Sequence, residues 1–294
     1  MGRISVVAGA FLWGTLALFV KKLSSFGFSE MEIVAIRVTG ACLCLIPFVF
    51  SVYGIGGLRW RMRHIWYFIG TGLFSIVFFN WAYFTAMNIM SISLAVMLLY
   101  TGPAFVAILS ALFLKEKMTW RKALAILMTV TGSAVIAISG NGTTGQLSAL
   151  GLIIGLGSGF GYALYSIFSK LASKHYDSMT ITFYTFLISA LCLLPFFPFW
   201  KKAAALPLEA WLFMAGLGLF PTVIAYLLYT YGLMQVETST ASILATIEPI
   251  AALMIAVLLF HEQLYGGQLA GTVLILSSIF VISYEKKQRD RLAA

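Results

Sequence analysis

Charged side chains are scarce in this sequence, since only 10% of its 294 residues are Asp, Glu, Lys or Arg. A soluble domain carries about 25%, because its surface must face water. Hydrophobic residues make up 61% of the chain, and the mean hydropathy is +0.97. One globule could not hide this much apolar surface from water. We therefore exclude a soluble protein and predict that lipid surrounds most of the chain.

The residues on which many enzymes and metal sites depend are also few. The three cysteines, Cys42, Cys44 and Cys192, lie inside apolar segments, where a thiol behaves as a small hydrophobe, so neither a disulfide framework nor a metal site is predicted. All three histidines lie at the ends of apolar segments, which argues against a histidine-based hydrolase at membrane depth. The sequence has no G-x-x-x-x-G-K-[ST] phosphate loop. We expect no enzyme, no cofactor and no direct use of ATP by this chain.

Apolar segments long enough to cross a bilayer recur along the whole sequence. A spanning helix needs about 20 predominantly apolar residues, and the alternation of a membrane β-barrel is absent. The connections are short and leave no room for a soluble domain. We predict an all-α membrane protein of ten transmembrane helices, near residues 4–23, 31–53, 65–87, 92–114, 120–139, 147–170, 179–200, 209–234, 239–260 and 265–284.

The basic residues are distributed unevenly between the two predicted sides. Four lie opposite the N-terminus, namely Lys21, Lys22, Lys201 and Lys202, and fourteen lie on its own side. This asymmetry predicts a plasma (inner) membrane protein with both termini in the cytoplasm. It also explains the net charge of +9 without a nucleic-acid partner. The fourteen are Arg3, Arg59, Arg61, Arg63, Lys115, Lys117, Arg121, Lys122, Lys170, Lys174, Lys286, Lys287, Arg289 and Arg291.

The first helix has no recognisable cleavage site. Residues 4–20 are apolar, but Lys21 and Lys22 follow them directly, without an A-x-A pattern. We therefore expect this segment to remain as a transmembrane helix.

The two halves of the sequence resemble each other at a nearly constant offset. The segment LCLIPF at 43–48 returns as LCLLPF at 191–196. Further pairs in register are Gly70 with Gly216, Gly72 with Gly218, Tyr83 with Tyr229, Ser93 with Ser239, Pro103 with Pro249 and Glu116 with Glu262. We predict two five-helix repeats, 1–144 and 145–294. Because five is odd, the second copy must be inverted, as in many secondary transporters whose solute site lies near the midplane.

Short motifs in a fixed order add a family resemblance. They are Trp13-Gly14 in the first helix, Arg37 in the second, Gly102-Pro103 with Glu116 in the fourth, and Glu248-Pro249 with Glu262 in the ninth. In these motifs, its span count and its duplication, the whole chain resembles the EamA branch of the drug/metabolite transporter superfamily. The resemblance implies export or uptake of amino acids, drugs or other small metabolites.

Two charged residues lie deep inside predicted spans, away from their ends. Glu248 lies near the bilayer centre, where a charge costs at least ~2.5–3.5 kcal/mol, and its repeat counterpart is Gly102. It is either a substrate or proton site, or a structural carboxyl bonded to unwound backbone beside Pro249. Arg37 could clamp a carboxylate, or tie helices together, with Glu248 as one candidate partner.

Many aromatic residues lie within spans rather than at the interfaces where aromatic belts form. Pairs at i, i+3, such as Tyr162 with Tyr165, share one helix face. A wall of tyrosines with an amide and a carboxylate suits an amphipathic or cationic solute, although ordinary helix packing is the simpler explanation for any one of them. The predicted substrate-binding residues are Trp13, Asn80, Tyr83, Tyr100, Tyr162, Tyr165 and Tyr229.

Glycines at 151, 155, 157, 159 and 161 form small-residue stripes in the sixth predicted helix. They favour close helix packing and leave open whether that packing is within one chain or between two. Both a monomer and a homodimer are therefore compatible with the sequence.

These features favour a secondary transporter or facilitator that exports amino acids or related metabolites by alternating access, with the bilayer, a small-molecule substrate and protons as partners. The alternative is an organic-cation transporter for drug efflux or choline-like uptake. A nucleotide-sugar or sugar-phosphate exchanger is disfavoured, because Arg37 is the one clear cation deep in a span and phosphates need several. An intramembrane enzyme is disfavoured because the sequence places no nucleophile–base pair at membrane depth. A non-transporting receptor is disfavoured because it would have no use for an inverted repeat.

Overall fold

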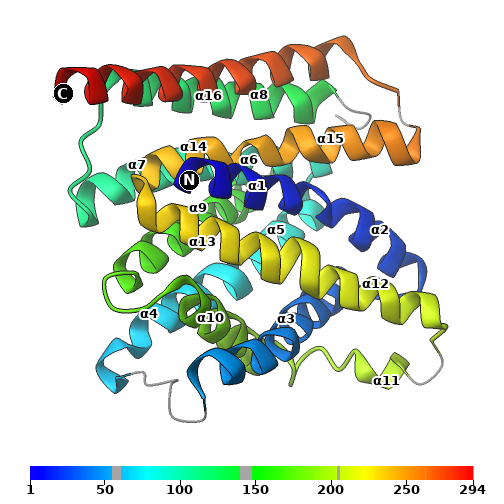
Figure 1. Ribbon diagram of the computed structural model, residues 1–294. Coiled ribbons are helices and arrows are strands. Elements are labelled where there is room, and N and C mark those ends of the chain that lie inside the picture. Colours follow the sequence, from blue (N-terminus) through cyan, green and yellow to red (C-terminus); the bar gives the residue numbers. More distant parts are fainter. Residues whose placement is uncertain (55–60, 140–147, 204–205, 262, 294) are drawn as a thin grey trace.

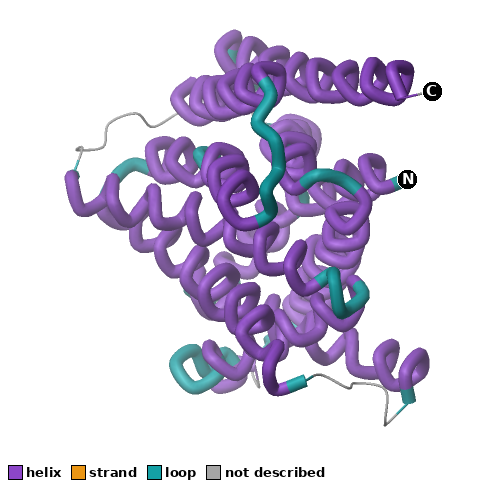
Figure 2. Tube along the Cα trace, turned by 90° about the vertical axis from the view of Figure 1, so that its left-hand side faces the viewer, coloured by secondary structure: helices purple, strands orange, loops and turns teal. Residues whose placement is uncertain are grey.

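The computed structural model describes residues 1–54, 61–139, 148–203, 206–261 and 263–293, and within these ranges every regular element is a helix (Figures 1 and 2). Nine helical segments in this part of the chain are long and apolar enough to cross a membrane, and a tenth, Ser178–Leu193, is apolar but shorter. The predicted all-α membrane fold is confirmed. Arg59, Glu262 and the boundary predicted between residues 144 and 145 lie outside the described residues, as do the side chains after residue 283.

Several spans consist of consecutive helical pieces. In chain order the spans are α1 (Gly2–Gly14) with α2 (Leu16–Ser25), α3 (Glu30–Tyr53), α4 (Ile65–Ile69) with η2 (Gly70–Val77) and α5 (Phe78–Ile89), α6 (Ile92–Leu99) with α7 (Gly102–Phe113), α8 (Trp120–Ser139), α9 (Ala149–Ala172), α10 (Ser178–Leu193), α12 (Leu208–Gly218) with η3 (Leu219–Ile224) and α13 (Ala225–Gln235), α14 (Thr238–Ala245) with α15 (Ile247–Phe260), and α16 (Gly266–Ala293). Two short helices, η1 (Met62–His64) and α11 (Trp200–Ala203), lie between spans.

The seventh span is shorter than the sequence predicts. A helix over 179–200 was expected, but α10 ends at Leu193. Pro195 and Pro198 follow, and a proline lacks the backbone N–H and disfavours the helical conformation of the residue before it. Sixteen residues at 1.5 Å per residue give about 24 Å, less than the hydrocarbon thickness of about 30 Å.

Three spans are interrupted at a threonine. Thr15, Thr101 and Thr246 separate the two helices of their spans, and each hydroxyl donates to the carbonyl three residues earlier, at 2.7, 2.6 and 2.6 Å. Such a bond competes with the helix ladder. Pro103 and Pro249 follow the second and third breaks and remove a further helix hydrogen bond. The breaks therefore arise from local sequence. The second and third lie at corresponding places in the two halves, whereas the counterpart of the first span, α9, is continuous.

The third and eighth spans each contain a π-helical segment, η2 and η3. In η3 the hydroxyl of Thr222 donates to the carbonyl of Leu217 at 2.6 Å, five residues away. Neither π-helical segment was predicted from the sequence. Such wider turns are rare and often lie at functional sites, and both of these segments lie within the bundle.

Helices α8 and α16 pack side by side along one edge of the bundle (Figures 1 and 2). Gly132 and Gly271 face each other so closely that a Cβ on Gly132 would lie 2.8 Å from the Gly271 carbonyl oxygen. Thr129 donates to Ser278 at 2.9 Å. Ser139 near the end of α8 contacts Gly267 near the beginning of α16, whereas the earlier Thr129 contacts the later Ser278, so the two helices run antiparallel. In the predicted repeats these helices are counterparts.

Glycines also set the crossings inside the bundle. Gly40 of α3 meets Gly218 of α12, and Gly72 of η2 meets Ile188 of α10. With the repeat offset, the second crossing is the counterpart of the first. The stripe on α9 follows the same rule, because its glycines face Met90, Leu98, Thr101, Phe78 and Phe79 of the same chain. The close packing predicted for this stripe is therefore found within one chain.

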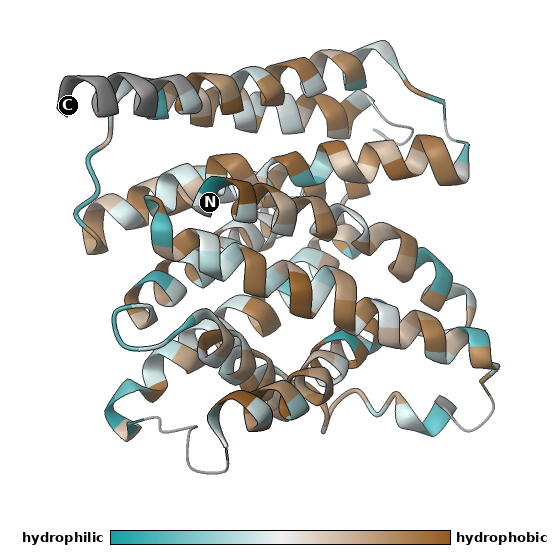
Figure 3. Cartoon of the chain, viewed as in Figure 1, coloured by the Kyte–Doolittle hydropathy of each residue, from teal (hydrophilic) through white to brown (hydrophobic). Residues whose placement is uncertain are grey.

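The outer helix surfaces carry mainly apolar side chains, and hydrophilic residues gather toward helix ends (Figure 3). We call one end of the bundle the N-terminal face, because Gly2 lies there against Gln235. It holds the ends of α7, α9 and α13 and the beginnings of α8 and α14. Their loops are joined by polar contacts between the halves.

Glu116 is central to these contacts. Its carboxylate accepts hydrogen bonds from the backbone amides of Thr238 and Ser239 and, at 2.7 Å, from the Ser239 hydroxyl. It thereby caps the N-terminus of α14 from the other half of the chain. Lys122 joins the same loops through an ion pair with Glu237 at 2.6 Å. Glu116, which corresponds to Glu262 in the second repeat, therefore has a structural role.

We predict that Glu116→Gln lowers the unfolding free energy by about 1 kcal/mol at neutral pH, a typical loss for a helix cap. Burial raises the pKa of Glu116, but hydrogen bonds from Ser239 and Thr238 outweigh it, so the net pKa is lowered. A lowered pKa in the folded state means that the carboxylate stabilises the protein above its unfolded pKa of about 4.3 and that this contribution is lost as pH falls through the folded value.

Thermal unfolding in detergent at pH 7 and at progressively lower pH measures this effect. Glu30→Gln, at an exposed position in the first turn of α3, is the matched control and should change little. A deficit of the Glu116 variant that persists undiminished in acid would contradict the capping role.

Candidate solute site

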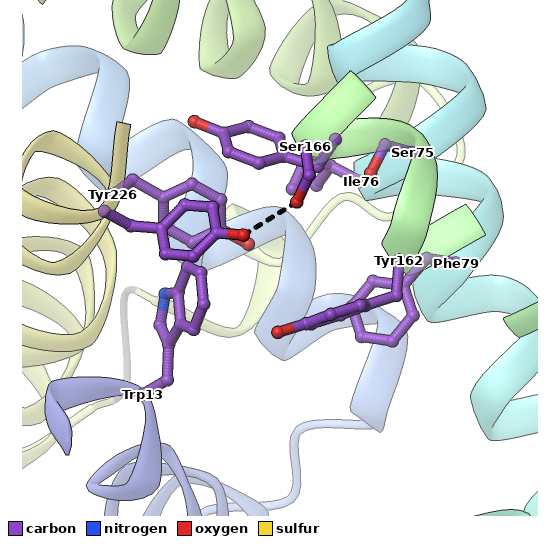
Figure 4. A pocket seen from close by; sticks show the side chains of 9 residues that line it. Trp13, Ser75, Ile76, Phe79, Tyr162, Ser166 and Tyr226 are labelled. Carbon is purple, nitrogen blue, oxygen red and sulfur yellow. Dashed lines mark hydrogen bonds between the residues drawn. The ribbon is translucent and has the colours of Figure 1, made fainter. Parts of the chain in front are cut away.

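A small cavity lies inside the bundle, where α1, η2, α5, α9 and α13 meet (Figure 4). The centre of a water molecule could occupy only about 10 Å³ of it, which is room for about one water. This conformation is therefore closed around the cavity. Its wall is formed by Trp13, Ser75, Ile76, Phe79, Tyr162, Tyr165, Ser166, Tyr226 and Tyr229.

Trp13 organises the aromatic part of the wall. Its ring centroid lies 4.8 Å from that of Tyr229, 5.0 Å from Tyr226 and 6.4 Å from Tyr162. Figure 4 shows Trp13 and Tyr226 on one side of the cavity and Tyr162 and Phe79 on the other. Edge-to-face rings at these separations attract one another. Residues from the first, third, sixth and eighth spans thus form one aromatic box.

Two pairs of hydroxyl groups connect α9 to α13 beside this box. Ser166 and Tyr229 are hydrogen-bonded at 2.7 Å (dashed in Figure 4), and Tyr165 and Thr230 are also 2.7 Å apart. All four side chains are buried. A buried hydroxyl needs such a partner because losing its hydrogen bonds to water is costly.

Arg37 of α3 is buried, with 4% of its surface exposed. Its Nη2 donates to the Tyr226 hydroxyl at 3.0 Å, and its guanidinium lies 5.6 Å from the centre of the Tyr226 ring. Among the described residues, its Nε has no hydrogen-bond partner. Arg37 therefore ties α3 to α13 through Tyr226, and its Nε–H can still donate to another acceptor.

Glu248 lies in the first turn of α15, immediately after the break at Thr246. It is half-buried, and in the described part of the chain no hydrogen bond or ion pair engages its carboxylate. The carboxylate interacts electrostatically with Arg37, but the two groups do not form an ion pair within 4.0 Å. The bond to backbone beside Pro249, one of the two roles considered for it, is not found among the described residues.

The remaining predicted residues lie around this centre. Tyr83 and Tyr100 are half-buried and within electrostatic range of Glu248, and Tyr83 stacks on Phe79 at 6.3 Å. Asn80 of α5 is buried and donates to the carbonyl of Ile76 in η2, within the same span, at 2.7 Å. It does not line the cavity in this conformation. The structure thus brings Trp13, Tyr162, Tyr165 and Tyr229 together and leaves the other three nearby.

Comparisons with known proteins agree with this architecture. The sequence pattern of the EamA-like transporter family matches residues 1–138 and 149–284. The chain belongs to the EamA-like transporter family. It is 28% identical over 280 residues to an uncharacterized transporter of Archaeoglobus fulgidus, covering 95% of each chain. It is 24% identical to the uncharacterized inner membrane transporter YicL of Salmonella typhimurium, covering 99% of this chain and 98% of that one.

A protein of known crystal structure shares the EamA-like fold. Its TM-score is 0.80 over 98% of both chains, at 21% sequence identity. The family resemblance predicted from the motifs is confirmed, and the protein is a multi-pass membrane transporter. The family describes transporters rather than enzymes and does not specify the solute.

Five residues of the cavity wall in this EamA-like protein were not predicted from the sequence, namely Ser75, Ile76, Phe79, Ser166 and Tyr226. Tyr226 was recognised as an aromatic residue within a span but was not chosen, although its i, i+3 spacing to Tyr229 was the available signal. Ser75 and Ser166 also line the cavity. Small hydroxyl residues are common in membrane helices as packing residues, so nothing in their local sequence separated them from that role.

We predict that Ser166 and Tyr229 are energetically coupled. Tyr229→Phe and Ser166→Ala should each cost about 1 kcal/mol of unfolding free energy, because each leaves the other hydroxyl buried without its partner. The double variant should lose less than the sum.

Denaturant titration in detergent measures the coupling. Tyr229→Phe combined with Thr129→Val, whose hydroxyl lies in the separate α8–α16 contact, is the control pair and should be additive. Additivity of the Ser166 and Tyr229 effects would show that their hydrogen bond contributes nothing.

Proposed function

We propose that this protein is a secondary transporter that exports zwitterionic amino acids or closely related metabolites across the cytoplasmic membrane by alternating access, with both termini in the cytoplasm. The observation that carries the proposal is the arrangement of Arg37 and Glu248. These opposite charges lie within reach of each other's field at the aromatic centre of the bundle and do not pair directly. A solute with a carboxylate and an ammonium group would satisfy both.

Each charge suits one end of such a solute. The guanidinium of Arg37 retains an unpartnered Nε, and guanidinium binds carboxylates through two parallel hydrogen bonds. The Glu248 carboxylate has no partner among the described residues, and an ammonium group would complement it. Charges left at membrane depth are expensive and are usually functional. The aromatic box around Trp13 offers an apolar surface for the side chain of the solute.

Three features support alternating access. The antiparallel packing of α8 on α16, and the counterpart crossings at Gly40 and Gly72, agree with two inverted repeats. Broken helices at the centre are typical of transporters built from such repeats. The cavity has room for about one water, so the bundle must change conformation before a solute can occupy it. Export and the cytoplasmic location of the termini rest on the family resemblance and on the distribution of basic residues.

An organic cation is the second candidate solute. Four aromatic rings, Trp13, Tyr162, Tyr226 and Tyr229, lie close together, and aromatic faces together with a carboxylate can hold a quaternary ammonium group. This candidate leaves Arg37 without a role in recognition. The two candidates therefore differ in their dependence on Arg37.

We predict that purified protein in liposomes carries neutral amino acids, and that Arg37→Lys raises the KM for them by about tenfold or more, equivalent to about 1.4 kcal/mol of lost binding. Lysine keeps the charge but cannot form the paired bonds to a carboxylate. Flux of a panel of amino acids, matching amines without the carboxyl group, and choline-like amines measures the selectivity.

Arg61→Lys, at an exposed position on the N-terminal face, is the matched control. Flux of the amines that survives Arg37→Lys unchanged, with no amino-acid flux in either protein, would favour the organic-cation candidate. Absence of flux for the whole panel would argue against the proposed function.

We further predict that Glu248 couples transport to protons. A carboxyl group that takes up a proton can exchange it for the solute ammonium, whereas the amide of Glu248→Gln cannot. The variant should lose the stimulation of flux by an imposed pH gradient, while solute-driven exchange at equal pH on both sides continues with a raised KM, because the amide binds the ammonium group less tightly. Flux of the variant that follows the pH gradient as strongly as wild type would remove Glu248 from proton coupling.

A further inference from the structure

A polar stripe runs along α9 from the cavity toward the N-terminal face. Tyr162, Ser166, Ser169 and Ser173 follow one another at spacings of four, three and four residues, so they share one face of the helix. Tyr162 and Ser166 line the closed cavity. Ser173 lines a second and larger cavity of about 680 Å³ at the N-terminal face, together with Lys170 and Lys174. The stripe therefore joins the two spaces.

The stripe faces α13, and hydrogen bonds now close the seam between the two helices. The Ser166–Tyr229 and Tyr165–Thr230 pairs lie nearest the central cavity. One to two turns further on, the ammonium group of Lys170 donates to the carbonyls of Leu233 at 2.6 Å and Val236 at 2.7 Å, at the end of α13. We call this contact the α9–α13 seam. It separates the cavity from the N-terminal face through interactions that are individually weak.

Two further hydroxyl groups at the seam are poorly satisfied. Ser169 Oγ of α9 and Thr182 Oγ1 of α10 are fully buried and interact with the Tyr165 hydroxyl, which Thr230 already engages at 2.7 Å, and in the described part of the chain neither forms a hydrogen bond of good geometry. A buried hydroxyl whose hydrogen bond is lost costs about 1–3 kcal/mol, and one whose bond is poorly formed bears part of that cost. Packing alone is better served by alanine, which fills similar space without that cost. Water or a polar solute that reached these hydroxyls in another conformation would supply well-formed hydrogen bonds, which explains their presence.

The corresponding position in the first half differs. The repeat relates α9 to α1 and α2, and α13 to α5. There α2 packs mainly on α12 and α3 instead of α5, and the counterparts of Tyr165 and Ser166 are the apolar Ala17 and Leu18. Tyr83, Tyr100, Tyr162 and Glu248 keep partial exposure. The polar, closed contact is thus specific to one side of the bundle.

We propose that the α9–α13 seam is the route by which a hydrated polar solute passes between the central site and the N-terminal face, with Ser166, Ser169 and Ser173 as its wall. When α13 moves away from α9, the hydroxyl pairs exchange their partners for water and solute. The inference rests on the proposed transport function, and it assigns solute contacts to residues outside the aromatic box.

Thiol labelling in proteoliposomes tests the proposal. The background protein carries alanine at Cys42, Cys44 and Cys192, and single variants add Ser169→Cys or Leu171→Cys at nearly the same depth. A small, charged, membrane-impermeant methanethiosulfonate is applied at the N-terminal face with amino acids on both sides. Since a buried thiol is inert, we expect Ser169→Cys to react at least about 10-fold faster than Leu171→Cys, which lies on the opposite face of α9.

Flux measured in the same vesicles separates the possible outcomes. Loss of flux after labelling of Ser169→Cys, but not after the same treatment of Leu171→Cys, supports the route. Equal, slow reaction of both variants while flux continues overturns the seam and leaves the transport function intact. Fast reaction of Ser169→Cys without flux of any solute still supports a water-filled route but counts against the proposed function. Slow reaction without flux overturns both.

Discussion

A polar group in the hydrocarbon of a membrane has to find its partner within the protein, and the bundle is shaped by this constraint. Where the helices break, the hydroxyls of Thr15, Thr101 and Thr246 bind carbonyls within their own spans. Where α13 ends and α14 begins, Lys170 and Glu116 supply partners from other helices. The helices can therefore be interrupted at the centre and near the ends of the spans, which gives the bundle points at which it can bend.

The sequence was sufficient for the features that depend on composition and on covalent geometry. Apolar length located the spans, and Pro249 marked one of the breaks. The same reasoning failed at the seventh span, where apolar residues continue past Leu193 but Pro195 and Pro198 end the helix. Side-chain partners were harder to predict. Arg37 bonds to Tyr226 and not to Glu248. This partner could not be predicted, because the distance between two helices depends on packing contacts such as that of Gly40 with Gly218, which no local sequence pattern specifies.

Around the site, corresponding positions in the two halves carry different residues. A Cβ on Gly102 would lie 2.8 Å from the ring of Tyr162, and a Cβ on Gly14 would lie 2.8 Å from the backbone oxygen of Glu248. The repeat relates Gly102 to Glu248 and Tyr162 to Gly14, so these are the same crossing seen in the two halves. Each crossing needs one glycine for close approach. The partner is then free to carry a larger or charged side chain, an aromatic ring in one half and a carboxylate in the other.

In the described part of the chain, two buried donors without partners lie beside the same tyrosine at the centre of the bundle. Trp13 Nε1 and Arg37 Nε are buried donors without partners among the described residues, and both side chains contact Tyr226. Leaving each donor unpaired costs about 1–3 kcal/mol, a large share of a typical unfolding free energy of 5–15 kcal/mol. A fold selected for stability alone would fill these positions with apolar residues. Their presence beside a small cavity at the centre of the bundle is consistent with donors whose hydrogen-bond partner is a transported solute.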